Sequence, residues 1–476
     1  MKKISNSVSG LTVKRSYRLF IAGLIALAVL NSCGVYKKYT SQTDAPENMF
    51  GTGDTIAQLQ SENSIADISW REFFKDPILQ RLIDTALVRN TDMQAARIAV
   101  EQSQASLRAA KLAYLPSLSL SPQASVSSTM NTGGTLSPAS YSYHVPLSLD
   151  WSIGISGSVT VNKRKANAVM LQAQASREAT QANLIATVAQ NYYQLLLLDK
   201  QLEILVKTDS LWDLSLETER AMWENGKAYS TAVNQMESST ISVKMQIIET
   251  RRSILSAENN MCKLLCMTPQ HIERGEWGSY ELPDRYSTGV PGVLLQNRPD
   301  IKAADQMLAE SFYNTALARA SFYPSFSLSG LLGWTNNGGL IADPGALLMQ
   351  AAASLVQPIF SQGKLIANLK IAKLNQQAKL DNYVQTVISA GNQVNECLAE
   401  CQVAKEKDVL YKRQVEVLQS AYNGTHELMN SGKASYIEVL TAQESLLKSQ
   451  LNEASNLYSG SISLISLYIA LGGTNK

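Results

Sequence analysis

The sequence predicts an α+β protein in which four amphipathic β-strands alternate with very long α-helices, and three observations support this prediction. Apolar residues occupy every odd position from Tyr141 to Ile155, which is the two-residue period of a strand with one apolar face. No proline occurs between Leu147 and Thr268 or after Pro358, and proline is the residue that most strongly interrupts a helix. Short motifs also recur in the same order at offsets of 206 and 208 residues, so the pattern occurs twice.

Residues 1–32 are expected to be a removable signal peptide. An apolar run over 19–30, too short to span a bilayer as a helix, follows a basic segment that contains Lys2, Lys3, Lys14, Arg15 and Arg18. The run ends in Leu30-Asn-Ser-Cys33, which resembles a bacterial lipoprotein signal in which Cys33 becomes the lipid-bearing N-terminus. Gly34 rather than aspartate follows, which favours sorting to the outer membrane. The alternative is an ordinary secretory peptide with a chance cysteine.

The charge of the chain excludes one class of partner. Charged residues make up 17 % of the sequence, and the formal net charge is +2. Removing the five cationic side chains of the leader changes this net charge to −3. The remaining chain therefore has no basic surface of the kind that nucleic acid requires, and we expect no nucleic-acid partner.

The first half of the chain is predicted to be one structural repeat over residues 68–267. A polar tether over 33–67 precedes it, and helical sequence extends to Leu115. A β-hairpin is expected at about 116–158, with a loop over 132–138. A helix of about 95 Å then covers 162–225, because leucines and other apolar residues recur every three or four positions. Gly226 is expected to form the tip, and a second helix to cover 231–265.

The second half repeats this plan over residues 292–471. An equatorial linker over 268–291 separates the repeats, and residues 472–476 form a tail. The second hairpin is expected at about 324–360, its last strand starting near Ser354, with helices over 364–430 and 437–471 and a tip near Gly432. Three glycines inside these helices predict local kinks, at Gly391, Gly424 and Gly460.

The alternating strands predict a membrane protein. Lipid offers no hydrogen-bond partner to the edge of an open sheet, so strands that cross a bilayer must close into a barrel. Bacterial barrels begin at about eight strands, so four strands must be shared: two copies give eight and three give twelve. The odd residues 145–155 are then expected to face lipid, with Ser148, Asp150 and Ser152 facing water. A soluble β-sandwich with a helical stalk is the alternative.

Several motifs together resemble the outer-membrane factor (TolC-like) family, and within it the NodT-type lipoprotein channels. They are the run from Trp70 to Leu79, Arg298-Pro-Asp-Ile301, the turns at Pro116 and Pro324, and the glycine tips. The resemblance implies a homotrimer with a twelve-stranded outer-membrane β-barrel, four strands per protomer, continued by a long α-helical coiled-coil barrel in the periplasm. It also implies an efflux channel that binds a periplasmic adaptor and an inner-membrane pump of the resistance-nodulation-division class.

The resemblance also assigns candidate site residues. Those that would contact the adaptor are Asn225, Gly226 and Lys227 at the first tip, and Ser431, Gly432 and Lys433 at the second. Glu438 matches an acidic position of the periplasmic gate, whereas Thr441 stands where relatives often carry aspartate. Three copies of Glu438 would focus negative potential on a narrow pore. The alternative is that Glu438 is a solvated surface charge.

No pattern in the sequence supports an enzyme. The three histidines are far apart, and the sequence has no Walker loop, dinucleotide fingerprint or Gly-x-Ser-x-Gly elbow. We expect no cofactor other than the lipid on Cys33, and no metal. Two cysteine pairs at i, i+4 spacing permit disulfides or a soft-metal site, but buried small hydrophobic residues are the favoured interpretation: Cys262, Cys266, Cys397 and Cys401.

Two other functions remain open from the sequence. One is the outer-membrane duct of a type I protein-secretion system, and the other is a non-conducting, lipid-anchored periplasmic scaffold. The lipoprotein leader favours efflux over secretion, and the strand alternation argues against the scaffold. An open duct filters its cargo weakly, so the pump is expected to select the exported compounds.

Overall fold

The computed structural model describes residues 37–41, 68–130, 132–134, 136–278, 297–336 and 346–473. The chain divides into two compact units. Unit 1 contains residues 1–42, 100–173 and 304–383, and unit 2 contains residues 43–99, 174–303 and 384–476. The predicted signal peptide, Cys33 and most of the tether and of the linker lie outside the described residues.

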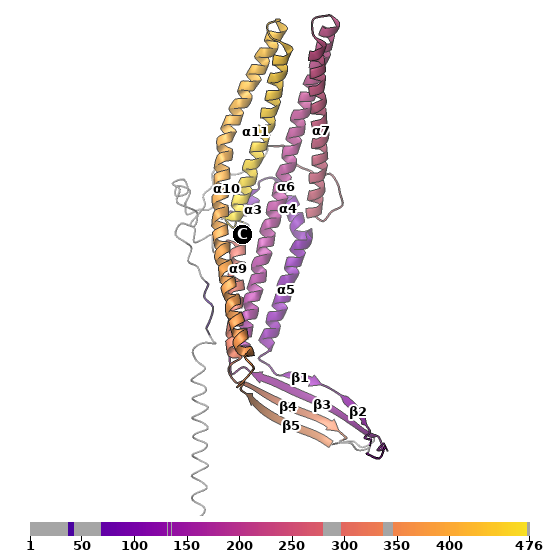
Figure 1. Ribbon diagram of the computed structural model, residues 1–476, viewed down its shortest axis with the longest axis vertical. Coiled ribbons are helices and arrows are strands. Elements are labelled where there is room, and N and C mark those ends of the chain that lie inside the picture. The colour runs from indigo at the N-terminus through magenta and orange to yellow at the C-terminus, as the bar shows by residue number, and fades with distance from the viewer. Residues whose placement is uncertain are drawn as a thin grey trace, which may run out of the picture. The chain divides into compact units, whose positions relative to one another are not determined.

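Unit 1 contains an antiparallel sheet (Figure 1). Its strands are β1 (Ser117–Leu120), β2 (Gln123–Ser127), β3 (Ser140–Ile153), β4 (Ser325–Thr335) and β5 (Ala346–Val356). The order across the sheet is β1-β3-β4-β5, and β2 also pairs with β3. The sheet is therefore four strand positions wide, with β1 and β2 sharing the first position.

The first of the four predicted strands is divided into two, β1 and β2. β1 ends before Ser121-Pro122 and β2 starts after it. Pro146 of β3 lies opposite this break, because its carbonyl accepts a hydrogen bond from the Ser121 N–H at 3.2 Å. In an antiparallel strand the N–H and C=O of one residue point to the same side, so the donor that Pro146 lacks would point at the break. On the other side, a Cβ at Gly333 would lie 2.6 Å from the Val145 carbonyl oxygen, so only glycine fits there.

Two other strand boundaries also differ from the prediction. β3 ends at Ile153, so Ile155 lies outside it. A turn in which the Gly157 N–H donates to the Gly154 carbonyl at 2.9 Å ends the extended chain, and Gly157 has a φ of +76° just before helix α6 begins. β5 covers Ala346–Val356 instead of starting near Ser354 and running to Phe360. Its run of alanines carries no alternation, which is why the sequence pattern missed its first eight residues.

The long helices have the same lengths in both halves of the chain. α5 (Thr91–Leu112) and α9 (Pro299–Ala320) have 22 residues each. α6 (Ser158–Glu224) and α10 (Lys364–Asn430) have 67 each, or about 100 Å. α7 (Ser230–Leu264) and α11 (Tyr436–Ala470) have 35 each. Two short helices precede them, α3 (Trp70–Phe73) and α4 (Pro77–Arg89).

Unit 2 packs around the apolar stripe that the sequence of α6 predicts. Ile185, Val188 and Leu195 are completely buried there, with Phe73, Ile465 and Tyr468 from other helices. The predicted kinks do not interrupt the helices, since α10 and α11 each form one continuous element. Gly460 instead permits close packing, because a Cβ there would lie 3.2 Å from the Ala404 Cβ.

Within the described ranges, no helix has a stretch both long and apolar enough to cross a membrane.

Candidate functional site

The sheet of unit 1 has one apolar and one polar face. Cross-strand partners lie on the same face of a sheet, and one row across it is Leu118, Leu149, Gly330 and Ala351. The neighbouring row contains Ser117, Asp150 and Ser329. Ser148, Asp150 and Ser152 therefore share the polar face, and the odd residues 145–153 share the apolar one, as the alternation predicts.

The apolar face of the sheet is exposed. Eight of its large side chains retain between 40 % and 75 % of their accessible surface, whereas others, such as Leu149, Trp151 and Phe326, are half-buried. The eight are Leu118, Leu120, Leu147, Leu332, Trp334, Leu347, Met349 and Leu355. A contiguous apolar surface of this kind marks contact with a membrane or with another protein. On the polar face, small hydroxyl groups pair with one another, as in the 2.7 Å hydrogen bond between Ser119 and Ser148.

The helical tips are two equivalent tight turns. Gly226 has a φ of +68° and Gly432 a φ of +72°, a conformation that glycine adopts at little cost. The following N–H groups donate back into the helix, Lys227 to Met222 at 2.8 Å and Lys433 to Leu428 at 2.8 Å. This is the Schellman motif, which satisfies the last carbonyls of α6 and α10. Asn225, Lys227, Ser431 and Lys433 are all exposed at these turns.

The predicted gate residues lie in the first turns of α11. The Glu438 carboxylate accepts a hydrogen bond from the Ser435 N–H at 2.7 Å and completes a capping box. Glu438 therefore also stabilises the start of the helix, a role that the sequence analysis did not foresee. Thr441, one turn further on, is exposed, and its hydroxyl donates to the Ile437 carbonyl at 2.8 Å.

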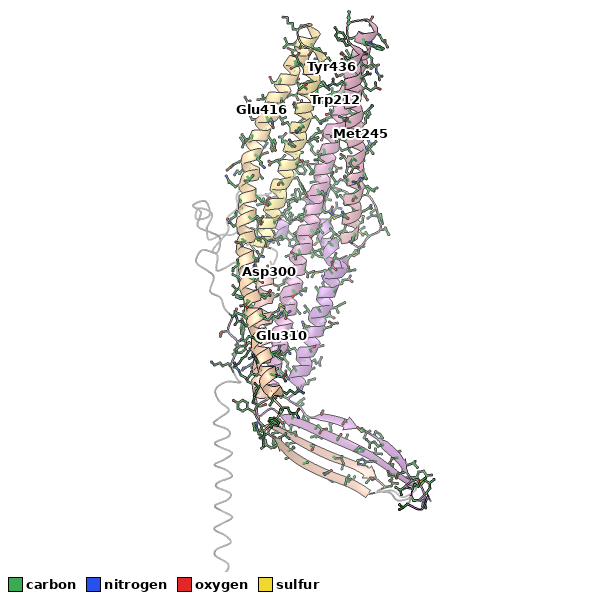
Figure 2. All side chains as sticks on the ribbon, viewed as in Figure 1. Trp212, Met245, Asp300, Glu310, Glu416 and Tyr436 are labelled. Atoms are coloured by element: carbon green, nitrogen blue, oxygen red, sulfur yellow. The ribbon has the colours of Figure 1, made fainter. Side chains whose placement is uncertain are left out.

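The two helical hairpins of unit 2 contact each other near this turn. The Tyr436 hydroxyl contacts Met236 Sδ on α7, and Ser239 donates to Glu444 at 3.0 Å. Trp212 is buried in the same cluster as Tyr436 (Figure 2). The first turns of α11 are thus held against α7 by side-chain contacts.

A group of charged side chains joins the segment after α7 to the helices. Arg274 donates to Asp199 of α6 and, at 2.6 Å, to Glu258 of α7, and His271 contacts Glu258 at 2.8 Å. The hydrogen bonds with Asp199 raise the pKa of Arg274. Burial opposes the charge of Glu258, but the bonds from Arg274 and His271 outweigh it and lower the pKa of Glu258. No sequence motif marked Arg274.

The residue just before α5 and the residue just before α9 have similar roles. Asn90 accepts from the N–H groups of Asp92 and Met93 and donates to the Leu264 carbonyl at 3.0 Å. Arg298 donates to the Ala470 carbonyl at 2.7 Å and to Asp300. Each residue thus joins the start of one helix to the C-terminal end of another. The sequence marked Arg298 only as part of a motif and did not mark Asn90.

The cysteines form no site in the described part of the chain. All four there are unpaired, and no group of three or more possible metal ligands occurs among the residues described. Burial raises the pKa of Cys397 to about 11 and that of Cys401 to about 12, so both thiols stay protonated. The expectation of burial holds for three cysteines and is wrong for Cys266, which is exposed with a φ of +49°.

Comparison with known proteins identifies the family. The family profile described as "Outer membrane efflux protein" matches residues 82–266 and, again, residues 290–473. The chain belongs to this family. The resemblance stated from the sequence motifs is confirmed.

Individual relatives match this chain in sequence or in structure over most of its length. The probable outer membrane lipoprotein SilC of Salmonella typhimurium is 29% identical over 417 residues, covering 86% of this chain and 89% of its own length. The solved MtrE outer membrane channel of Neisseria gonorrhoeae, in its open state, is 26% identical, with a TM-score of 0.78, and the match covers 93% of this chain and 99% of that one. The solved outer-membrane channel OprN has the same fold, with a TM-score of 0.82 at 21% identity, over 92% of this chain and 99% of that one.

The protein is therefore an outer-membrane channel component of an efflux system, as predicted. Its family is one of transport channels.

Proposed function

We propose that three copies of this chain share one twelve-stranded barrel in the outer membrane, continued by a helical barrel built from two repeats per chain. The sheet with one apolar and one polar face supports this proposal most directly. Among the described residues, the outer edges formed by β1 and β2 and by β5 have no strand partner within the chain. In lipid each unpaired backbone group costs several kcal/mol, so the edges must pair with neighbouring copies.

Barrel size favours three copies over two. An eight-stranded barrel has an interior that its own side chains fill, whereas a transport channel needs an aqueous passage. Twelve strands are the next multiple of four. The small polar-face residues, such as Ser148 and Ser152, are suited to line such a passage because they leave it wide.

Two adjacent substitutions test the barrel. Leu149→Lys puts a charge on the apolar face, where lysine near the bilayer midplane costs about 2–4 kcal/mol. Ser148→Lys puts the same charge on the polar face. We expect Leu149→Lys to lose most of the trimer, by light scattering in detergent, and Ser148→Lys to form trimers with a lower cation preference in planar bilayers. Equal assembly of both variants, or a monomeric parent protein, would contradict the shared barrel.

The proposed system also has a lipid anchor on Cys33, a periplasmic adaptor at the tips and an inner-membrane pump of the resistance-nodulation-division class. SilC, whose name describes a lipoprotein, supports the anchor. The tips are suited to docking because hydrogen bonds close the backbone of each turn while Lys227 and Lys433 are exposed. A photo-cross-linking amino acid at Lys227 should form adducts with a periplasmic adaptor in cells, and one at the exposed Lys407 of α10 should not. Adducts at neither or both positions would count against tip docking.

Glu438 is proposed as the charge of the periplasmic gate, in addition to capping α11. Glutamine also completes a capping box, so Glu438→Gln removes the charge while keeping the helix start. The variant should conduct with reduced cation preference, and Thr441→Asp should increase that preference because it adds a carboxylate one turn away. Unchanged selectivity in both variants would leave Glu438 with its capping role alone.

A further inference from the structure

The residues that follow the proposed lipid attachment site dock onto two helices in unit 1, α6 and α9. We call residues 37–41 the strap. The Tyr39 hydroxyl donates to Asp305 Oδ1 of α9 at 2.7 Å, and the Tyr39 N–H donates to the Tyr313 hydroxyl at 3.3 Å. Arg164 of α6 donates to the Lys37 carbonyl at 3.5 Å. A groove beside the strap is completed by residues of α9 and α10, among them Leu308, Phe312, Lys373, Gln377 and Leu380.

Tyr39 occupies a built receptor. Asp305 and Tyr313 are 7 % and 6 % exposed, so both of its hydrogen-bond partners are almost completely buried. The Tyr39 ring lies 5.8 Å from the Phe312 ring and packs on a small core formed by α6 and α9. Burial, then the bond to Asp305, raises the pKa of Tyr39, so its hydroxyl keeps the proton that it donates.

The bond from Tyr39 also satisfies a buried charge. One Asp305 oxygen accepts from Gln306 at 3.0 Å, and the other accepts from Tyr39. Removing Tyr39 would take a hydrogen bond from a carboxylate that water hardly reaches, which is more costly than losing an exposed contact. The polar tether sequence gave no sign of this, because a single tyrosine shows no periodicity.

We propose that Tyr39 is a docking residue and that the strap fastens the lipid-bearing N-terminus to α6 and α9 next to the sheet. Five residues separate Cys33 from Tyr39, so the chain lets Cys33 reach at most about 20 Å from Tyr39. The part of α9 between Asp305 and Ala320 is about 22 Å long and ends just before β4 begins. A chain that extends about 20 Å from Tyr39 therefore covers nearly the whole distance to the sheet. The lipid can therefore enter the membrane beside the strands of its own protomer. The placement of the lipid beside the strands rests on the lipid anchor proposed above, whereas the docking of Tyr39 does not.

Limited trypsin digestion tests the docking. Protease cleaves a docked segment only when the segment opens, and the bond after Lys38 adjoins Tyr39. The full chain is exported with an ordinary secretory signal and carries Cys33→Ser, so that no lipid is present. We expect cleavage after Lys37 or Lys38 to be at least about tenfold faster in Tyr39→Ala than in the parent. Asp305→Asn and Tyr39→Phe, which keeps the ring contact, should show smaller increases.

Internal references keep the result interpretable. Cleavage after Lys227 and Lys433, at the exposed tips, should be the same in every variant, and Thr40→Ala should match the parent. If Tyr39→Ala does not fold, Tyr39→Phe provides the comparison. Equal strap cleavage in parent and folded variants, or parent cleavage as fast at the strap as at the tips, would overturn the proposal. Acylation of Cys33 is measured separately by mass spectrometry of the unmodified chain, so failure of the anchor and failure of the docking are distinguishable.

Discussion

The C-terminal ends of α7 and α11, 206 residues apart, have the same backbone geometry and different residues at its critical position. Met267 donates to the Cys262 carbonyl at 2.9 Å, and Gly473 donates to the Tyr468 carbonyl at 3.0 Å. The left-handed residue between them is Cys266 in the first half, with a φ of +49°, and Gly472 in the second, with a φ of +85°. The turn is thus required in both halves, whereas glycine is used in one.

The residues that join helix ends differ in the same way. Asn90 contacts the end of α7 through one amide, and Arg298, 208 residues later, contacts the end of α11 through a guanidinium that also holds Asp300 and Gln393. Glu258, which binds Arg274, is matched 206 residues later by the buried apolar Leu464. The first half has to hold the segment that follows α7, and it uses charges to do so. The comparison indicates that backbone geometry is shared while the side chains that stabilise it are interchangeable.

The largest expected effect comes from removing the joining residue in the second half. Arg298→Ala removes the donor to the Ala470 carbonyl and to Gln393, and leaves Asp300 with the Ile301 N–H as its remaining donor. This change should cost about 3 kcal/mol, whereas Asn90→Ala should cost about 1–2 kcal/mol. In a chain of this size, 1 kcal/mol corresponds to a melting-temperature shift on the order of 1–2 °C. Calorimetry in detergent should give a lower melting temperature for Arg298→Ala than for Asn90→Ala. Arg251→Ala, at an exposed position, is the control and should leave the melting temperature unchanged. The reverse order would show that Asn90 is the more important residue.

Placing a side chain at the glycine turn should have the next largest effect. Gly472→Ala forces a Cβ into the left-handed region and to within 3.1 Å of the Asn297 carbonyl carbon, so we expect a loss of about 1–2 kcal/mol. Gly432→Ala has the same φ penalty, but a Cβ there meets nothing within 4 Å, and it should cost less. A melting temperature lower for Gly432→Ala than for Gly472→Ala would contradict the contribution of the close contact.

The charged cluster of the first half should make its stability depend on pH. The pKa of Glu258 is lower in the folded state than its ordinary value of 4.5, so its contribution is present above about pH 4.5 and is lost as the pH falls through the folded value. Glu258→Gln should lower the free energy of unfolding by about 1–2 kcal/mol at pH 7, measured as a lower melting temperature. The decrease should be smaller at pH 3. His271 and Arg274 contact the same carboxylate, and Asp199 contacts Arg274. His271→Ala, which removes one of the two partners of Glu258 and keeps its charge, should have a smaller effect at pH 7 than Glu258→Gln. A difference that is constant with pH would exclude this role.

The sequence predicted those parts of the fold that depend on local pattern. The bounds of α10 follow from the absence of proline and from Gly432, and the faces of β3 follow from alternation. The break in the first strand has a local signal, since Pro122 lies within the alternating run and proline interrupts a strand ladder. Asn90 with Leu264, Arg274 with Asp199 and Tyr39 with Asp305 were not predictable, because each pair is brought together only by tertiary packing across at least 75 residues. The contacts of Glu438 with Ser435 are local, and a Ser-x-x-Glu pattern could have revealed them.

The smallest expected effect makes the two halves alike. Cys266→Gly relieves a non-glycine residue of the left-handed conformation, which costs about 1–2 kcal/mol, but it also increases the entropy of the unfolded chain. The net gain should therefore be at most about 1 kcal/mol, measured as a higher melting temperature. Cys266→Ala removes the exposed thiol and keeps the backbone conformation, so it should leave the melting temperature unchanged. If Cys266→Ala stabilises the protein as much as Cys266→Gly, then the thiol and not the backbone is the source of the effect, and the two helix ends do not differ in strain.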